Sequence, residues 1–193
     1  MTTTFQGFPR LRKAVRIDGH RLRFYDAKLE DAGFIHGLRT NSDRAQFLSV
    51  VPKQLACQED WLRRYAGDDT QAYFVVCDGA THERLGTVRL YGTNEKNAFT
   101  WGSWLLKVGL PAYCAIESAL MVYHYGLSLG FNASYFEVHK DNVSVWRFHE
   151  RFGAQRVGAR DDQLLYDLSP EALQAALIKY RRYLPSGIQV HAM

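Results

Sequence analysis

The sequence predicts a mixed α/β fold, in which a central, twisted and mostly antiparallel sheet is flanked by helices. One observation is a run of three consecutive strand patterns between residues 72 and 106, which favours antiparallel neighbours. Another is a helix–strand–helix succession between residues 115 and 152. The predicted order, ββαα-βββ-α-β-α-β-β, has a largely antiparallel front half with one αβα unit behind it.

The front half begins with a hairpin and two helices. Residues 14–19 and 21–25 alternate apolar with polar side chains around Asp18-Gly19, as paired strands do around a turn. A helix is expected from Leu29, with apolar side chains along one stripe, and a second from about residue 58 to residue 65.

Three strands should follow. Residues 72–77 are continuously apolar, which indicates a central strand buried on both faces. Residues 85–91 alternate, and residues 99–106 are aromatic and rich in strand formers. Gly102 lies inside the last of these and suggests a bulge or a close backbone approach.

The second half alternates helices with strands. Its helices are bounded by Gly130, a good residue to follow a helix C-terminus, and by Ser169, a good N-cap before Pro170. The expected elements are helix 115–129, strand 135–139, helix 143–152, a strand pair at 156–158 and 164–167, and helix 170–184.

Composition describes one globular domain of 193 residues, with 47% hydrophobic and 23% charged residues. The net charge is +4, but basic and acidic residues are interspersed, so we expect no nucleic-acid partner. Three cysteines form no metal-like spacing and the seven histidines form no ligand pair, so no metal is expected. Without an apolar leader or spanning segment, we expect a cytoplasmic protein with no membrane partner.

Two strand-to-helix junctions carry the most information. The first is the Gly109-Leu-Pro-Ala-Tyr113 loop before the apolar helix, and the second is the polar turn that ends in Asn142. Helix N-termini attract phosphate and polar acyl groups through their free amides and dipole. Such junctions can place two N-termini near one spot.

The motif from Asn142 to Gly153 resembles the GNAT N-acetyltransferase superfamily. Asn142 is followed eleven residues on by a glycine, and His149 occupies the position where many members have tyrosine. The Arg39-Thr-Asn41 and Gln58–Leu62 segments are similar to the branch that contains ribosomal-protein alanine and amino-sugar acetyltransferases. The likeness covers about residues 21–168.

The resemblance implies a fold splayed between the strands near 98–106 and 134–139, and acetyl-CoA as co-substrate. One departure stands out: Pro111 and Tyr113 replace the glycines usual in the phosphate-binding loop, and proline has no N–H to offer. The residues expected to bind the cofactor are Leu105, Leu106, Lys107, Gly109, Ala112, Tyr113, Cys114, Ala115 and Asn142.

Two residues are candidates for proton transfer. His149 should face inward on its helix, either as a histidine bonded to backbone or as the donor that protonates the departing CoA thiolate, a role that family tyrosines play. Glu137 or His139, on one strand face with Tyr135, could accept the amine proton through water. Equally, Glu137 could be a structural carboxylate paired with an arginine.

The acceptor side is less defined by sequence. Arg39 and Asn41 end the first helix, where they either cap it or bind the acceptor, and Ser103 could position a water. Trp101 and Trp104 should point to opposite strand faces, one into the core and one toward the acceptor pocket.

The resemblance predicts direct acetyl transfer to the primary amine of a small molecule, with a nucleotide-linked amino sugar favoured. Alternatives are acetylation of a protein N-terminus or a small amine, and a non-catalytic domain that senses CoA or binds a partner. A homodimer stays open.

Overall fold

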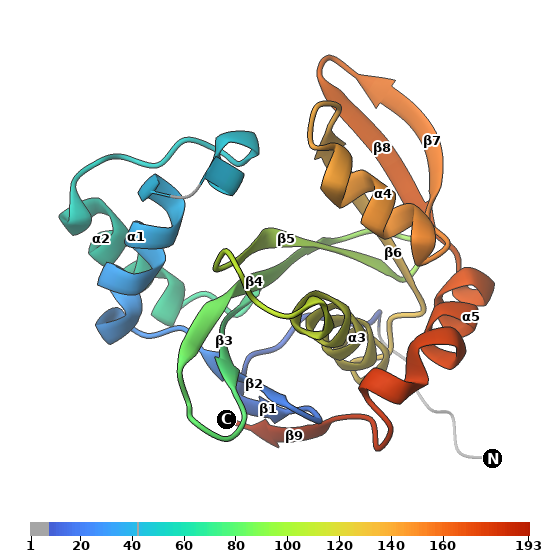
Figure 1. Ribbon diagram of the computed structural model, residues 1–193, viewed down its shortest axis with the longest axis horizontal. Coiled ribbons are helices and arrows are strands. Elements are labelled where there is room, and N and C mark those ends of the chain that lie inside the picture. The colour runs from blue at the N-terminus through green and yellow to red at the C-terminus, as the bar shows by residue number, and fades with distance from the viewer. Residues whose placement is uncertain (1–7, 42) are drawn as a thin grey trace.

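The computed structural model describes residues 8–41 and 43–193, without the side chains of residues 41, 43 and 44. Its strands form one nine-stranded sheet in the order β7-β8-β6-β5-β4-β3-β2-β1-β9 (Figure 1). The strands are β1 Ala14–Asp18, β2 Leu22–Asp26, β3 Ala72–Asp78, β4 Arg84–Thr93, β5 Ala98–Leu106, β6 Ala133–His139, β7 Gln155–Arg160, β8 Gln163–Leu168 and β9 Gln189–Ala192.

The helices cover this sheet from both sides. Figure 1 shows α1 and α2 near one end, α3 across the middle, and α4 with β7 and β8 at the other end. The α-helices are α1 Ala32–Asn41, α2 Leu55–Ala66, α3 Ala112–Ser128, α4 Val143–Arg151 and α5 Pro170–Tyr180. Short 3-10 turns are η1 Leu29–Asp31, η2 Asp43–Phe47 and η3 Arg181–Tyr183.

The strand register confirms the predicted splay. Adjacent strands pair antiparallel except β5 and β6, which run parallel and pair only at Ala98–Ala133 and Phe99–Ser134. Beyond those two pairs the strands diverge, because β5 continues to Leu106 and β6 to His139 without further ladder contacts. The sheet thus opens between residues 98–106 and 134–139.

Two hydrophobic cores lie on opposite faces of the sheet. Phe74 and Val76 of β3 belong to the core that includes α3, whereas Tyr73 and Val75 belong to the core under α1 and α2. Since both faces of β3 are covered, every residue from 72 to 77 is buried, as its continuous apolar run predicted.

A bulge in β5 overturns one prediction. Between the pairs Arg89–Gly102 and Thr87–Leu105, β5 advances three residues where β4 advances two, and Ser103 has a φ of +46°. The extra residue resets the alternation of side chains. Trp101 and Trp104 therefore lie on the same face, with their ring centroids 5.3 Å apart, and the prediction of opposite faces was wrong.

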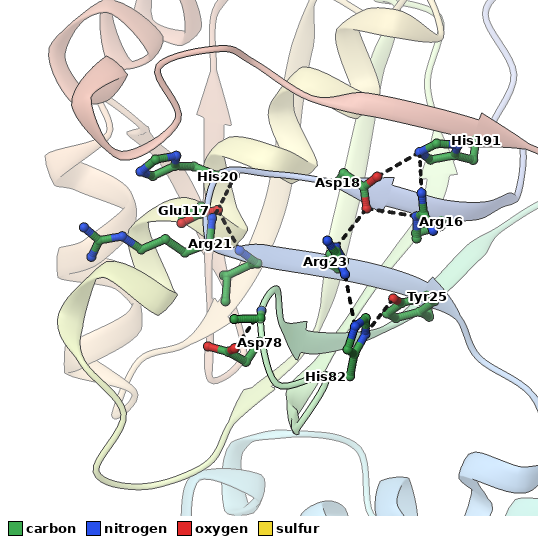
Figure 2. Close-up of polar contacts among 12 residues, drawn as sticks. Arg16, Asp18, His20, Arg21, Arg23, Tyr25, Asp78, His82, Glu117 and His191 are labelled. Atoms are coloured by element: carbon green, nitrogen blue, oxygen red, sulfur yellow. Dashed lines mark hydrogen bonds and ion pairs between the residues drawn. The ribbon is translucent and has the colours of Figure 1, made fainter.

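The structure also shifts helix boundaries and adds a strand to those predicted from sequence. Helix α3 begins at Ala112 rather than at residue 115, with Pro111 as its N-cap. The last helix ends at Tyr180 and tightens into η3. Strand β9 was not predicted; it pairs antiparallel with β1, and His191 contacts Asp18 of β1 at 2.8 Å beside Arg16 (Figure 2).

Candidate active site

A cavity of about 500 Å³ occupies the gap between β5 and β6. It is lined from both faces of the sheet: Phe136 and Val138 of β6 belong to the α3 core, whereas Glu137 and His139 project from the opposite face. The first turn of α3, the inner face of α4 and the η2 segment complete it. Among the predicted site residues, it is lined by Trp101, Ser103, Leu105, Leu106, Ala115, Glu137, Asn142 and His149.

His149 lies on the inner face of α4, where an aromatic cage surrounds it. Its ring is 4.1 Å from that of Phe136 and 5.3 Å from that of Trp101, measured between centroids. The side chain is 5% exposed, and Nδ1 is buried with no hydrogen-bond partner among the described residues. The predicted inward orientation is confirmed. The alternative, a hydrogen bond from the ring to the backbone, is not formed by Nδ1 among the described residues.

Burial changes the chemistry expected of this imidazole. Desolvation lowers the pKa of His149 to about 3, because the cage offers no counter-charge to an imidazolium. His149 is therefore neutral at physiological pH, so one ring nitrogen donates a hydrogen bond and the other accepts one. The sequence suggested a residue that gives up a proton to the thiolate, whereas a neutral imidazole acts as a hydrogen-bond donor.

The two candidate proton acceptors lie on the other face of β6. Glu137 accepts a hydrogen bond from Arg160 Nη2 at 2.8 Å, which matches the structural pairing considered above, yet its side chain is 46% exposed and lines the cavity. His139 Nδ1 accepts from the Asp141 amide at 3.2 Å and its ring lies 5.3 Å from Phe47. Both can reach water in the cavity.

The N-terminus of α3 is open to an anion. Pro111 provides no side-chain cap, the first turn carries no acidic residue, and Gly109 turns the preceding loop with a φ of +83°. The first amides of a helix lack intrahelical acceptors, so those of Ala112 and Tyr113 suit a phosphate. The Cys114 amide instead donates to the Pro111 carbonyl at 3.0 Å.

We expected Lys107 to bind the cofactor at this N-terminus, but its side chain is engaged elsewhere. Its ammonium forms an ion pair with Glu83 at 2.8 Å and lies 5.8 Å from the centroid of the Phe34 ring. The positive charge near the helix start comes from Arg21, whose guanidinium lies 4.8 Å from the Tyr113 ring centroid. Sequence reasoning missed Arg21 because it belongs to a hairpin almost a hundred residues upstream.

A buried carboxylate holds that hairpin against α3. Glu117 is 1% exposed, and its Oε1 accepts hydrogen bonds from the amides of His20, Arg21 and Leu22 at 2.7, 2.7 and 2.9 Å. Figure 2 shows Glu117 of α3 reaching the turn between β1 and β2. The contact fixes the turn that carries Arg21 beside the start of α3.

Asn142 stands at the second helix start. Its carbonyl accepts hydrogen bonds from the Val145 and Trp146 amides, but its side chain caps no backbone amide of the helix. Among the described residues, the side-chain oxygen accepts a hydrogen bond from the Ser144 hydroxyl at 3.4 Å. The amide group is half-buried and lines the cavity, so it is available to a ligand.

On the acceptor side, two residues that were predicted separately, Arg39 and Ser103, form a hydrogen bond. Arg39 Nη1 donates to Ser103 Oγ at 3.4 Å, and Nη2 donates to the carbonyl and hydroxyl of Ser49 at 2.8 and 2.9 Å. Arg39 therefore ties the end of α1 to the β5 bulge. Asn41 ends α1, and its side chain lies outside the described part of the structure.

Comparison with known proteins identifies the fold family. Residues 21–155 match the acetyltransferase (GNAT) domain model. The chain belongs to the GNAT acetyltransferase family. No curated protein matches it by sequence.

Solved GNAT structures resemble the chain over most of its length. FdhC in its apo form, a nucleotide-linked sugar GNAT, is 33% identical with a TM-score of 0.77, covering 88% of this chain and 98% of that one. A GCN5-related N-acetyltransferase from Brucella melitensis is 19% identical, with a TM-score of 0.75 and coverages of 92% and 89%. Spermidine N-acetyltransferase from Vibrio cholerae, in complex with CoA and spermine, is 18% identical, with a TM-score of 0.66 and coverages of 76% and 93%.

Two further features concern the part of this GNAT domain that the structure describes. In residues 8–41 and 43–193, no helix combines the length and apolar character needed to cross a bilayer. Within the same ranges, no three histidine, cysteine or acidic side chains gather as metal ligands.

Proposed function

We propose that this GNAT protein transfers the acetyl group of acetyl-CoA directly to a primary amine. The observation that carries the proposal is the cavity between β5 and β6, which is lined from both faces of the sheet. Two substrates can then meet from opposite sides, and holding both in one site converts a bimolecular reaction into an effectively unimolecular one.

Cofactor binding is assigned to the α3 side of the cavity. The open amides of Ala112 and Tyr113 suit the CoA diphosphate, and the backbone of Leu105 and Leu106 suits the pantetheine arm and the thioester carbonyl. Gly109 and the Asn142 side chain complete the set, with Ala115 against the pantetheine. Arg21 replaces Lys107 as the nearby cation, because Lys107 is engaged by Glu83.

The reaction forms a C–N bond and breaks the C–S bond of the thioester. The amine nitrogen attacks the carbonyl carbon and loses one proton, and the CoA sulfur leaves as a thiolate that then takes one proton from solvent. Glu137 or His139 accepts the amine proton through cavity water. His149, as a neutral imidazole, donates a hydrogen bond to the developing thiolate, where a buried donor is worth more than in water.

A nucleotide-linked amino sugar is the acceptor we favour. The support is the nucleotide-linked sugar GNAT that is 33% identical over 88% of this chain. Likeness to the spermidine enzyme, at 18% identity, supports the fold alone. Arg39, Asn41, Trp101 and Ser103 are the residues assigned to this side of the site.

Release of free CoA thiol tests the proposal. The protein is incubated with acetyl-CoA and a panel of amines: nucleotide-linked amino sugars, free amino sugars, polyamines and N-terminal peptides. Turnover with nucleotide-linked amino sugars supports it. Binding of acetyl-CoA without turnover of any amine would instead indicate a non-catalytic, CoA-sensing domain.

A further inference from the structure

Two arginines on the acceptor side form no ion pair with any carboxylate that the structure describes. Among the described residues, Arg39 of α1 donates hydrogen bonds to Ser103 and Ser49. Arg89 of β4 lies against aromatic rings, with its guanidinium 5.5 Å from the Trp61 centroid and 4.5 Å from that of Tyr91. Within residues 8–41 and 43–193, neither forms an ion pair with a described carboxylate.

Arg89 is a half-buried charge with unmet hydrogen-bonding capacity. Its Nε is inaccessible to solvent and has no partner among the described atoms. Burial lowers the pKa of its guanidinium, and the nearby positive charge of Arg39 lowers it further, although arginine stays charged in proteins. A charge held in this way is costly to the free protein and is relieved when an anion binds.

Both arginines converge on the β5 bulge beside the cavity. Arg39 donates to Ser103, and the Arg89 guanidinium lies against the ring of Tyr91, which reaches Gly102. Ser103 and Gly102 line the cavity, and the two arginines lie behind them. Tyr91 crosses Gly102 so closely that an added Cβ would lie 2.8 Å from its hydroxyl. The two guanidiniums thus adjoin the bulge that forms one wall of the cavity, one residue away from the lining of the site where we assign acetyl transfer.

The anion cannot be the CoA diphosphate that we assign to α3. Trp61, against which Arg89 lies, packs in the core under α1 and α2, whereas α3 packs in the core on the opposite face of the sheet. A phosphate at Arg39 and Arg89 must therefore come from the acceptor. Guanidinium forks match phosphate oxygens in pairs, which makes arginine the preferred residue for such groups.

We propose that Arg39 and Arg89 form a phosphate-binding subsite that selects a phosphorylated amine acceptor and excludes polyamines by charge repulsion. This rests on the proposed acetyl transfer and names its substrate class. The sequence pointed to Arg39 but not to Arg89, which looks like an ordinary polar residue of an alternating strand.

Binding of inorganic pyrophosphate tests the subsite directly. Isothermal titration is done with CoA at saturation, so that the α3 site is filled. We expect wild type to bind, and Arg39→Gln and Arg89→Gln to bind about tenfold more weakly or worse, since hydrogen bonds to charged groups contribute about 1.5–3 kcal/mol. Arg182→Gln, a surface change near the C-terminus, should bind as wild type does.

Steady-state kinetics separate this proposal from the proposed function. Arg39→Gln should raise the KM for a nucleotide-linked amino sugar at least tenfold, with the KM for acetyl-CoA unchanged, and Arg89→Lys should restore part of what Arg89→Gln loses. Equal pyrophosphate binding by wild type and both glutamine variants would overturn the subsite even if acetyl transfer occurs. Weakened pyrophosphate binding without turnover of any amine would leave the subsite standing and remove the acetyltransferase proposal.

Discussion

The neutral, caged His149 decides how the leaving thiolate is stabilised. We predict that His149→Phe, which keeps the aromatic packing, lowers kcat about 10²-fold or more with little change in the KM for acetyl-CoA. Because the pKa of His149 is about 3, both enzymes should share the same alkaline limb in their pH–rate profiles. A near wild-type kcat in the variant would reduce this residue to packing.

The same imidazole should make folding sensitive to acid. The folded-state pKa of about 3 lies below the unfolded value of about 6.5, so the unfolded chain binds the extra proton first as the pH falls. The free energy of unfolding should therefore fall between pH 6.5 and 3, by at most about 1.4 kcal/mol per pH unit from this group. Denaturant titrations of wild type and His149→Phe should diverge only in this window; parallel curves would contradict the buried, neutral state.

At the scale of elements, the β1–β2 turn depends on one carboxylate of α3. We predict that Glu117→Gln destabilises the protein by about 1.5–3 kcal/mol, because charge-assisted bonds to three amides are weakened. Glu59→Gln, which removes an exposed helical ion pair with Arg63, should cost no more than about 0.5 kcal/mol. Urea unfolding of both variants makes the comparison, and equal midpoints would disprove the clamp.

At the start of α4, a variant of Asn142 can distinguish a role in ligand binding from a role in helix capping. Since the Asn142 side chain caps no amide, Asn142→Ala should change the free energy of unfolding by no more than about 0.5 kcal/mol, less than the loss typical of a cap. We expect the KM for acetyl-CoA to rise in the same variant. Loss of stability with an unchanged KM would show that the residue is structural.

Much of this architecture followed from local patterns, and the exceptions have physical causes. Helices and strands from residues 14 to 180 were predictable because their apolar periodicity is strong. Strand β9 was missed since four residues carry little periodicity and are ordered by pairing with β1. The common face of Trp101 and Trp104 depends on a left-handed Ser103, which no alternation rule anticipates.

Site residues that belong to one sequence motif were predictable, whereas those that meet only through folding of distant segments were not. Asn142 and His149 share a helix, so spacing alone placed them in one region. Arg21, Arg89 and Glu117 act through contacts across the fold, and each looks ordinary within its own segment. An isolated glutamate inside the apolar α3 helix was the one available signal, because buried carboxylates need partners.

For the whole molecule, acetyl-CoA should stabilise the native state. A ligand present at about 100 times its Kd and bound only to the folded protein adds about 2.7 kcal/mol. Thermal unfolding with and without millimolar acetyl-CoA measures this, with ATP as the control for general anion binding. Equal shifts for the two ligands, or none for acetyl-CoA, would contradict the cofactor assignment.

Acetyl transfer across the splayed sheet is tested most directly by following CoA thiol release with a nucleotide-linked amino sugar, its free amino sugar and spermidine as parallel acceptors. The account predicts the highest kcat/KM for the nucleotide-linked sugar, at least tenfold above the free sugar, with spermidine lowest because two guanidiniums face it. Spermidine turned over fastest, or no preference for the phosphorylated acceptor, would contradict it.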